Sequence, residues 1–256
     1  MKRLFPLLVV SLLSCISMSA QVGEHRNDFS IGVNGGLVMS NVGFMPEVPQ
    51  TWHQGMTGGL TLRYTCEKYF NSICAVVAEV NYAQVGWKED IQTPNDEPVI
   101  NATTGLPEKY QRDMTYVQVP FMARMGWGRE RRGVQFFVQA GPQVGFFLNE
   151  KTKMNFPWDK RTPVLDDGTG RTSSVIAQDT MSVQRKIEYG ITGGLGLEFS
   201  LNRVGHFLIE GRYYYGLGDI FDNSKRDYFG RSNLSTVNVK LTYLFDITRT
   251  RNPKIK

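Results

Sequence analysis

The side chains best suited to chemistry in this 256-residue sequence are three histidines: His25, His53 and His206. A hydrolase or acyltransferase would need one of them beside a serine and a carboxylate, and a zinc site would need it grouped with cysteines or other histidines. His53 follows Trp52 with no serine at a hydrolase spacing, and no H-E-x-x-H or G-x-S-x-G motif occurs. The sequence therefore predicts no catalytic residue, no bound metal and no cofactor.

A second chemical signal is a set of charged residues that alternate with apolar ones. In a strand, alternate residues point to the same face, so these charges would gather on one side of a sheet. Buried charges cost several kcal/mol unless they are paired, and this set holds both signs. We expect them to form a mutually neutralising network. The set is Arg63, Glu79, Arg124, Glu188, Glu198, Glu210, Arg212 and Lys240.

Cys66 and Cys74 flank a short predicted turn, and their even spacing places both on one face of a hairpin. In an oxidising compartment a disulfide across the turn is feasible. Free thiols at the edge of a membrane are the alternative interpretation.

The elements that would position these residues are eight segments with a period of two. Strict alternation over this length indicates strands, and a strand tilted through a bilayer needs about 9–11 residues. The segments are 29–40, 60–65, 74–83, 116–127, 134–148, 186–199, 207–217 and 236–245.

The connections between these segments alternate between short and long. Short turns are expected at 67–72, 128–133 and 200–205, and long loops at 43–55, 88–113, 149–184 and 221–233. Long structureless loops are unusual in compact soluble domains, whereas short periplasmic turns and long extracellular loops are typical of outer-membrane barrels.

A soluble sandwich or a lipocalin-like barrel would also alternate, so the aromatic residues help to distinguish the classes. They gather toward strand ends, where interfacial girdles lie, and the last segment ends on Phe245. No run of 18 apolar residues occurs, so a spanning chain must close its sheet to pair every backbone group. We predict an all-β fold: an eight-stranded antiparallel up-and-down transmembrane β-barrel whose narrow lumen is filled by the charged set.

The N-terminal segment has the features of a targeting signal. Lys2 and Arg3 precede an apolar stretch, and small residues up to Ala20 follow, as in a secretory signal. A lipidated Cys15 is the alternative. We expect a signal peptide at 1–20, a periplasmic segment at 21–27, the barrel at 28–245 and a basic periplasmic tail at 246–256. The net charge is +5, or +3 without Lys2 and Arg3, which does not favour nucleic acid as a partner.

Arginines gather on the predicted periplasmic side. They form a solvated rim, or they contact an acidic periplasmic partner or anionic lipid. The residues are Arg129, Arg131, Arg132, Arg249 and Arg251.

Several stretches resemble the PorT-type outer-membrane β-barrel family of Bacteroidetes. They include Glu67–Phe70 leading into Ala78–Tyr82, Tyr116–Phe121 and Val138–Pro142, and then Gly194–Phe199, Glu210–Leu217 and Tyr243–Phe245. The resemblance covers essentially the whole mature chain and implies an eight-stranded outer-membrane barrel. The tail after Phe245 departs from the usual end of such barrels.

The resemblance also implies an accessory role in protein secretion of the type IX kind, or in outer-membrane assembly, with a secretion-machinery or periplasmic protein as partner. A structural or adhesive surface protein that binds ligands through its long loops, with contacts from Trp52, Trp158 and Tyr228, is the alternative. A narrow solute channel is the weaker one. We expect the chain in the outer membrane of a Gram-negative cell, in contact with outer-membrane lipid and lipopolysaccharide.

Overall fold

Eight long antiparallel strands follow one another around a closed ring in the computed structural model, which describes residues 23–93, 95–101, 103–156, 181–201, 204–222 and 227–250. The predicted signal peptide and residues 251–256 lie outside these ranges. The strands are β1 (Glu24–Met45), β3 (His53–Tyr69), β4 (Ser72–Asp90), β5 (Lys109–Gly128), β6 (Gly133–Met154), β7 (Ile187–Leu201), β8 (Gly205–Gly216) and β9 (Arg231–Thr248). The short β2 (Gln50–Thr51) pairs with the outer end of β4.

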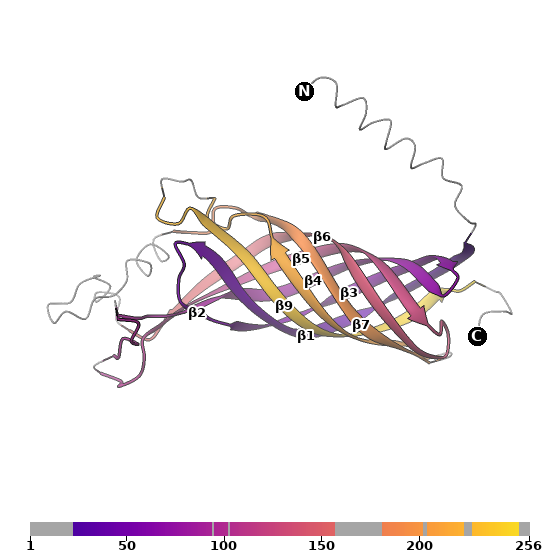
Figure 1. Ribbon diagram of the computed structural model, residues 1–256, viewed down its shortest axis with the longest axis horizontal. Helices are drawn as coiled ribbons and strands as arrows, with labels where there is room; N and C mark the ends of the chain where they lie inside the picture. The colour runs from indigo at the N-terminus through magenta and orange to yellow at the C-terminus, as the bar shows by residue number, and fades with distance from the viewer. Residues whose placement is uncertain are drawn as a thin grey trace, which may run out of the picture.

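Pairing between the first and last long strands closes the ring. β1 and β9 run side by side from the Phe29–Thr248 pair to the Met45–Arg231 pair. Each remaining long strand pairs with the next one along the chain, so the fold is the predicted up-and-down barrel (Figure 1). No described helix has the length and apolar character needed to cross a membrane.

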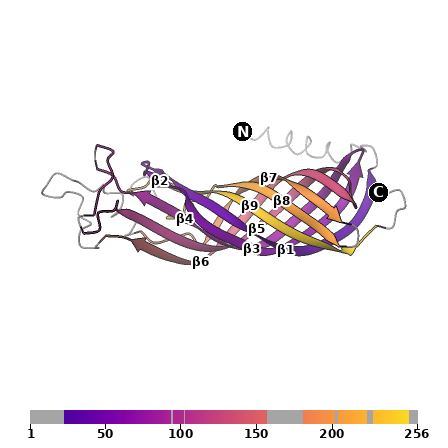
Figure 2. The same ribbon diagram turned by 90° about the horizontal axis from the view of Figure 1, so that it is seen from below.

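The two ends of the barrel differ, as Figure 2 shows most clearly. The short turns, the start of β1 and the end of β9 lie at one end, and the long connections extend from the other. This is the predicted arrangement of periplasmic turns and extracellular loops.

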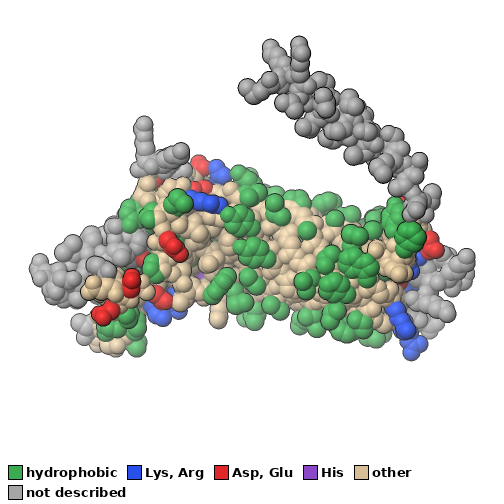
Figure 3. Space-filling view, in the orientation of Figure 1, with side chains coloured by type: hydrophobic (Ala, Val, Ile, Leu, Met, Phe, Trp, Pro, Cys, Tyr) green, Lys and Arg blue, Asp and Glu red, His purple; other side chains and the backbone are tan. Residues whose placement is uncertain are grey.

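Apolar side chains cover the outside of the barrel from the turn end to beyond its middle (Figure 3). Val80 and Tyr82 of β4, for example, are 52% and 50% exposed, and Leu241 of β9 is 62% exposed. A soluble protein rarely exposes so large an apolar surface. We call this band the lipid-facing belt.

The strands are longer than predicted because the alternation changes its chemistry near the outer end. In the belt, β4 places polar Glu79 and Asn81 inside and Val80 outside. Farther out, the same inward register carries Val85 and Trp87, while Gln84 faces outward. The predicted loops at 43–55 and 88–113 are therefore partly strand: β1 runs to Met45, β4 to Asp90, and β5 begins at Lys109.

An apolar cluster fills the outer part of the barrel. Trp87 is fully buried and its ring meets Phe44 edge-on at 5.4 Å and Phe221 at 6.0 Å. Phe221 and Phe229 come from the connection between β8 and β9, which packs its aromatic rings against the strand residues. We call this cluster, with its neighbours Val42, Val85, Tyr110 and Met114, the outer core.

The boundary of the belt can be tested with cysteines placed on β4. In a background without Cys66 and Cys74, Gln84→Cys is expected to react with a membrane-impermeant maleimide on intact cells, because it lies beyond the belt. Val80→Cys, which faces lipid, is expected to react at least tenfold more slowly. Equal labelling of the two positions would contradict the assigned boundary.

Candidate functional site

The centre of the lumen holds a cluster of two carboxylates and two cations. Arg212 binds Glu79 through both terminal nitrogens, at 2.9 and 2.8 Å, and also donates to Glu210 at 2.6 Å. The Lys240 ammonium lies 2.7 Å from Glu79. All four side chains are buried, and the cluster carries no net charge when all of them are ionised. The strands β4, β8 and β9 each contribute, so the cluster crosses the barrel.

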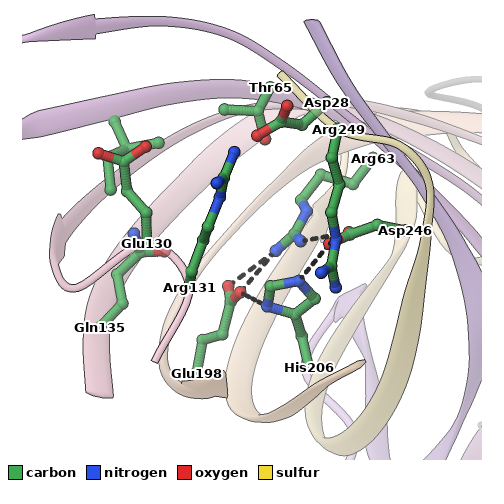
Figure 4. A pocket seen from close by; sticks show the side chains of 11 residues that line it. Asp28, Arg63, Thr65, Glu130, Arg131, Gln135, Glu198, His206, Asp246 and Arg249 are labelled. Carbon is green, nitrogen blue, oxygen red and sulfur yellow. Dashed lines mark hydrogen bonds and ion pairs between the residues drawn. The ribbon is translucent and has the colours of Figure 1, made fainter. Parts of the chain in front are cut away.

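A second cluster lies nearer the turn end (Figure 4). Glu198 of β7 accepts hydrogen bonds from Arg63 of β3 at 2.8 Å and from Arg124 of β5. His206 lies 2.7 Å from Glu198 through Nδ1 and 3.0 Å from Asp246 through Nε2. The Arg124 guanidinium also stacks on the Phe137 ring, 3.7 Å from its centroid. The ion pairs of this cluster thus connect five strands, β3, β5, β7, β8 and β9.

Seven of the eight charged residues predicted for the lumen lie in these two clusters. Glu188 is the exception: it is buried, but no described cation forms an ion pair with it, and its Oε1 has no hydrogen-bond partner within the described residues. Its surroundings are Tyr116, Tyr214 and the backbone at Gly216. An isolated buried carboxylate is costly, so we expect Glu188 to be a neutral acid between the ionic clusters and the outer core.

Sequence reasoning missed His206 and Asp246. Asp246 was placed in the tail, but β9 continues to Thr248 and keeps Lys240, Thr242, Leu244 and Asp246 on the inward register. Asp246 also accepts a hydrogen bond from Ser30 at 2.5 Å, across the β1–β9 seam. Following the alternation past Phe245 would have found this carboxylate.

Ser–His–Asp arrangements occur twice among the described residues, although His53 has no serine at a hydrolase spacing along the sequence. Ser40 pairs with His53 across β1 and β3; its Oγ lies 3.4 Å from Nδ1, and His53 Nε2 lies 2.7 Å from Asp113. The pairing joins positions thirteen residues apart, so no local spacing reveals it. Ser200, His206 and Asp246 form the other.

Neither serine is placed to act as a nucleophile. A catalytic hydroxyl must reach substrate, whereas Ser40 is fully buried and donates to the Gly86 carbonyl while accepting from the Gly86 amide, both at 2.9 Å. Ser200 is 2% exposed beneath the second ionic cluster. We read both as structural links between strands. Among the described residues no group of His, Cys, Asp and Glu could hold a metal ion.

Cys66 and Cys74 are free thiols in the structure, so the predicted disulfide is absent. The pairing register shifts between Thr65 and Glu67, and Glu67 rather than Cys66 lies opposite Cys74. The Cys66 thiol donates to the Cys74 carbonyl at 3.3 Å. Even spacing does not place the two cysteines opposite each other, because the bulge at Cys66 shifts the register of the hairpin.

The periplasmic arginines are partly used inside the protein. Arg131 donates to the Thr250 carbonyl, and Arg249 donates to Asp246 at 2.6 Å, whereas Arg129 and Arg132 are exposed. Arg251 lies outside the described residues. The charge at this end of the barrel is also partly neutralised, because Glu130 in the β5–β6 turn binds two cations.

Those two cations are Arg26 at 3.0 Å and Lys68 at 2.7 Å, on β1 and β3. Burial alone would raise the pKa of Glu130, but the hydrogen bonds and charges of Arg26 and Lys68 outweigh it and hold the pKa below its usual value. The turn is therefore fastened to the strands opposite it by charge.

A groove of about 360 Å³ lies on the outer wall just beyond the belt. His53 and Asp113 meet in it, and the side chains around them include four amides, two lysines and the carboxylate of Glu150. These lining residues include Gln54, Gln84, Gln111, Asn149, Lys151 and Lys153, with Tyr82 at the belt edge. We call it the wall groove. It offers many hydrogen-bond donors to a polar ligand.

Comparison with known proteins gives one family match. The family described as outer membrane protein beta-barrel domain matches residues 19–222. No curated protein shows a significant match to the chain.

Solved structures with a similar fold include three outer-membrane or surface proteins. Ail, the attachment invasion locus protein of Yersinia pestis, is 13% identical over 86% of this chain and 99% of its own, with a TM-score of 0.35. OprG from Pseudomonas aeruginosa is 14% identical over 87% and 98%, with a TM-score of 0.37. Neisserial surface protein A is 8% identical over 85% and 97%, with a TM-score of 0.39. These similarities concern the fold alone.

Glu79 is paired with cations and, within the described residues, Glu188 is not, so the same substitution at the two positions gives a matched comparison. Glu79→Gln removes charge that Arg212 and Lys240 need, so we expect it to destabilise the barrel by about 3–5 kcal/mol. Glu188→Gln keeps the shape of a neutral acid and is expected to cost less than about 1 kcal/mol. Urea unfolding in detergent micelles measures both. Equal losses would show that Glu188 is ionised and paired.

The Glu130 contact predicts a dependence on acid. A carboxyl whose folded pKa is depressed stabilises the protein above its unfolded value, and that stability is lost as the pH falls through the folded pKa. We expect wild type to be more stable than Glu130→Gln at pH 7, and the difference to shrink below about pH 4.5. Thermal unfolding at both pH values measures this. A difference unchanged by acid would contradict the ion pairs.

Proposed function

The chain belongs to the outer membrane protein beta-barrel domain family and lies in the outer membrane, and from that premise we propose that it is a surface recognition protein. It binds ligands with the outer wall of the barrel and with its extracellular loops. This is the adhesive alternative that the sequence predicts. The observation that supports it is the continuation of the strands beyond the belt.

The part of the barrel wall beyond the belt has the properties of a binding surface. β4 and β5 continue past the belt as paired strands, from Gln84–Thr115 to Asp90–Lys109. The outer core keeps the inner face of this wall rigid, because Trp87, Tyr110 and Met114 are fully buried. A rigid wall loses little conformational freedom when it binds. A barrel needed only as an anchor has no use for such an extension.

The wall groove indicates the chemistry of the ligand. Its amide side chains can donate and accept hydrogen bonds, Lys151 supplies positive charge and Tyr82 supplies an aromatic face, while Lys153 pairs with Asp113 at 2.7 Å. A hydroxyl-rich, partly acidic ligand such as an acidic glycan suits this combination. Trp52 and Tyr228, predicted as loop contacts, are 50% and 43% exposed on the same outer part. Trp158 lies outside the described residues.

The filled lumen argues against the channel alternative. The two ionic clusters occupy the half nearer the turns, and the outer core occupies the other half. An eight-stranded barrel leaves room for little more than these side chains. Purified protein in a planar bilayer is therefore expected to give no steady conductance.

Binding can be tested on cells that display the full chain. Gln84→Trp fills the wall groove and Lys151→Glu reverses a charge at its edge, so each is expected to lower retention on immobilised acidic polysaccharide at least tenfold. Lys109→Glu is the matched control, because Lys109 pairs with Asp90 outside the groove. Surface labelling checks that the amounts displayed are equal.

Unchanged retention of the Gln84→Trp and Lys151→Glu cells would rule out the wall groove as the binding surface. Retention no better than that of cells without the protein would overturn the recognition function itself.

A second candidate is the accessory role in secretion or assembly that the PorT resemblance implies. The observation that favours it is the exposure of Arg129 and Arg132 on the periplasmic turn, where an acidic partner could bind. Arg129→Glu with Arg132→Glu is expected to reduce the secretion of surface proteins, measured in culture fluid, while leaving polysaccharide binding unchanged. Normal secretion by the double variant would count against this role.

A further inference from the structure

A second groove, of about 340 Å³, lies on the opposite part of the outer surface. We propose that it binds the phosphorylated sugar headgroup of a glycolipid in the outer leaflet. The site is independent of the wall groove, since it is formed by β1, β8, β9 and the segment before β3.

The floor of this groove is polar although the surface below it faces lipid. Asn41 lies opposite Ser235, and Gly43 lies opposite Asn233, in the pairing of β1 with β9. Gly43 makes the hollow: a Cβ there would come within 2.9 Å of Asn233 Oδ1. On β1, Met39 and Leu37 lie two and four residues before Asn41 and face outward like it. They are 37% and 62% exposed. The floor thus begins where the belt ends.

The walls of the groove are aromatic. Trp52 lines the groove and is 50% exposed, and Tyr213 and Tyr215 of β8 line it as well and are 50% and 36% exposed. Tyrosine and tryptophan suit this height in a membrane because they have an apolar face and a polar edge. Their faces can stack on the C–H surface of a sugar ring. Aromatic side chains beside a hydrogen-bonding floor suit a carbohydrate better than an acyl chain.

A cation completes the site. Arg231 lines the groove, and one terminal nitrogen donates to the Tyr215 hydroxyl at 2.6 Å. That contact fixes the guanidinium and leaves its other donors for a ligand. Among the described residues no carboxylate forms an ion pair with Arg231. A planar guanidinium is well suited to bind phosphate through two parallel hydrogen bonds.

Position and charge together identify the occupant. A headgroup of the outer leaflet lies at the edge of the belt, carries sugar hydroxyls for the floor and places phosphate within reach of Arg231. An ordinary phospholipid offers phosphate but no ring to stack between Trp52 and Tyr213. A protein partner would have to enter between the barrel and its surrounding lipid.

The test uses the full chain in nanodiscs of phosphatidylcholine, with lipid A carrying two phosphates as the probe. Native mass spectrometry and tryptophan fluorescence report bound lipid. We expect wild type to bind lipid A at least tenfold more tightly than phosphatidylglycerol. Arg231→Gln is expected to weaken lipid A binding about tenfold, and dephosphorylated lipid A to bind wild type as weakly.

Ser235→Phe, which fills the floor and keeps Arg231, serves as a second variant if the first fails to fold. Trp127→Ala is the matched control, because Trp127 belongs to the belt at the turn end. Heat-dependent gel mobility checks folding. Equal binding of lipid A and phosphatidylglycerol, or full binding by both groove variants, would overturn the proposal. So would lipid A binding that only Trp127→Ala weakens.

Discussion

The pairing of every backbone amide and carbonyl group in the lipid layer is the constraint on which this structure depends. The β1–β9 seam meets it by closing the sheet, from Phe29 opposite Thr248 to Met45 opposite Arg231. Closure with eight strands fixes a narrow interior that side chains must fill. The charged lumen, the outer core and the polar grooves all follow from how one ring of strands meets lipid on part of its length and water on the rest.

The interior is filled by two different means along its length. Near the turns, Glu79, Glu198 and Asp246 are held by the arginines, Lys240 and His206, so the fill is ionic and directional. Farther out it is apolar, with Trp87 and Phe221 sharing the Arg112 guanidinium at 5.6 Å from each ring. Ionic clusters need specific partners from several strands, and they thereby favour a single register of the barrel. The apolar fill adds packing without that specificity.

The sequence alone was sufficient for the strand order and the turn and loop sides, because alternation marks which side chains share a face. For the same reason, seven of the eight charged residues that it predicted for the lumen lie in the two clusters. It was insufficient where a residue's surroundings depend on distant strands. Val85 and Trp87 break the polar-inside pattern, so the strand was ended at Ala83, although the register continues. The bulge beside Cys66, the contact of Ser40 with His53 and the isolation of Glu188 are set by pairing geometry, which composition and spacing do not encode.

The length of β4 sets how far the protein reaches from the cell. Seven residues, from Gln84 to Asp90, continue beyond the belt. At about 3.3 Å per residue and a tilt near 45°, they raise the tips of the connections by roughly 16 Å. That height carries the tips away from the surface of the surrounding lipid. Large molecules in solution can then reach the tips without first entering the lipid layer.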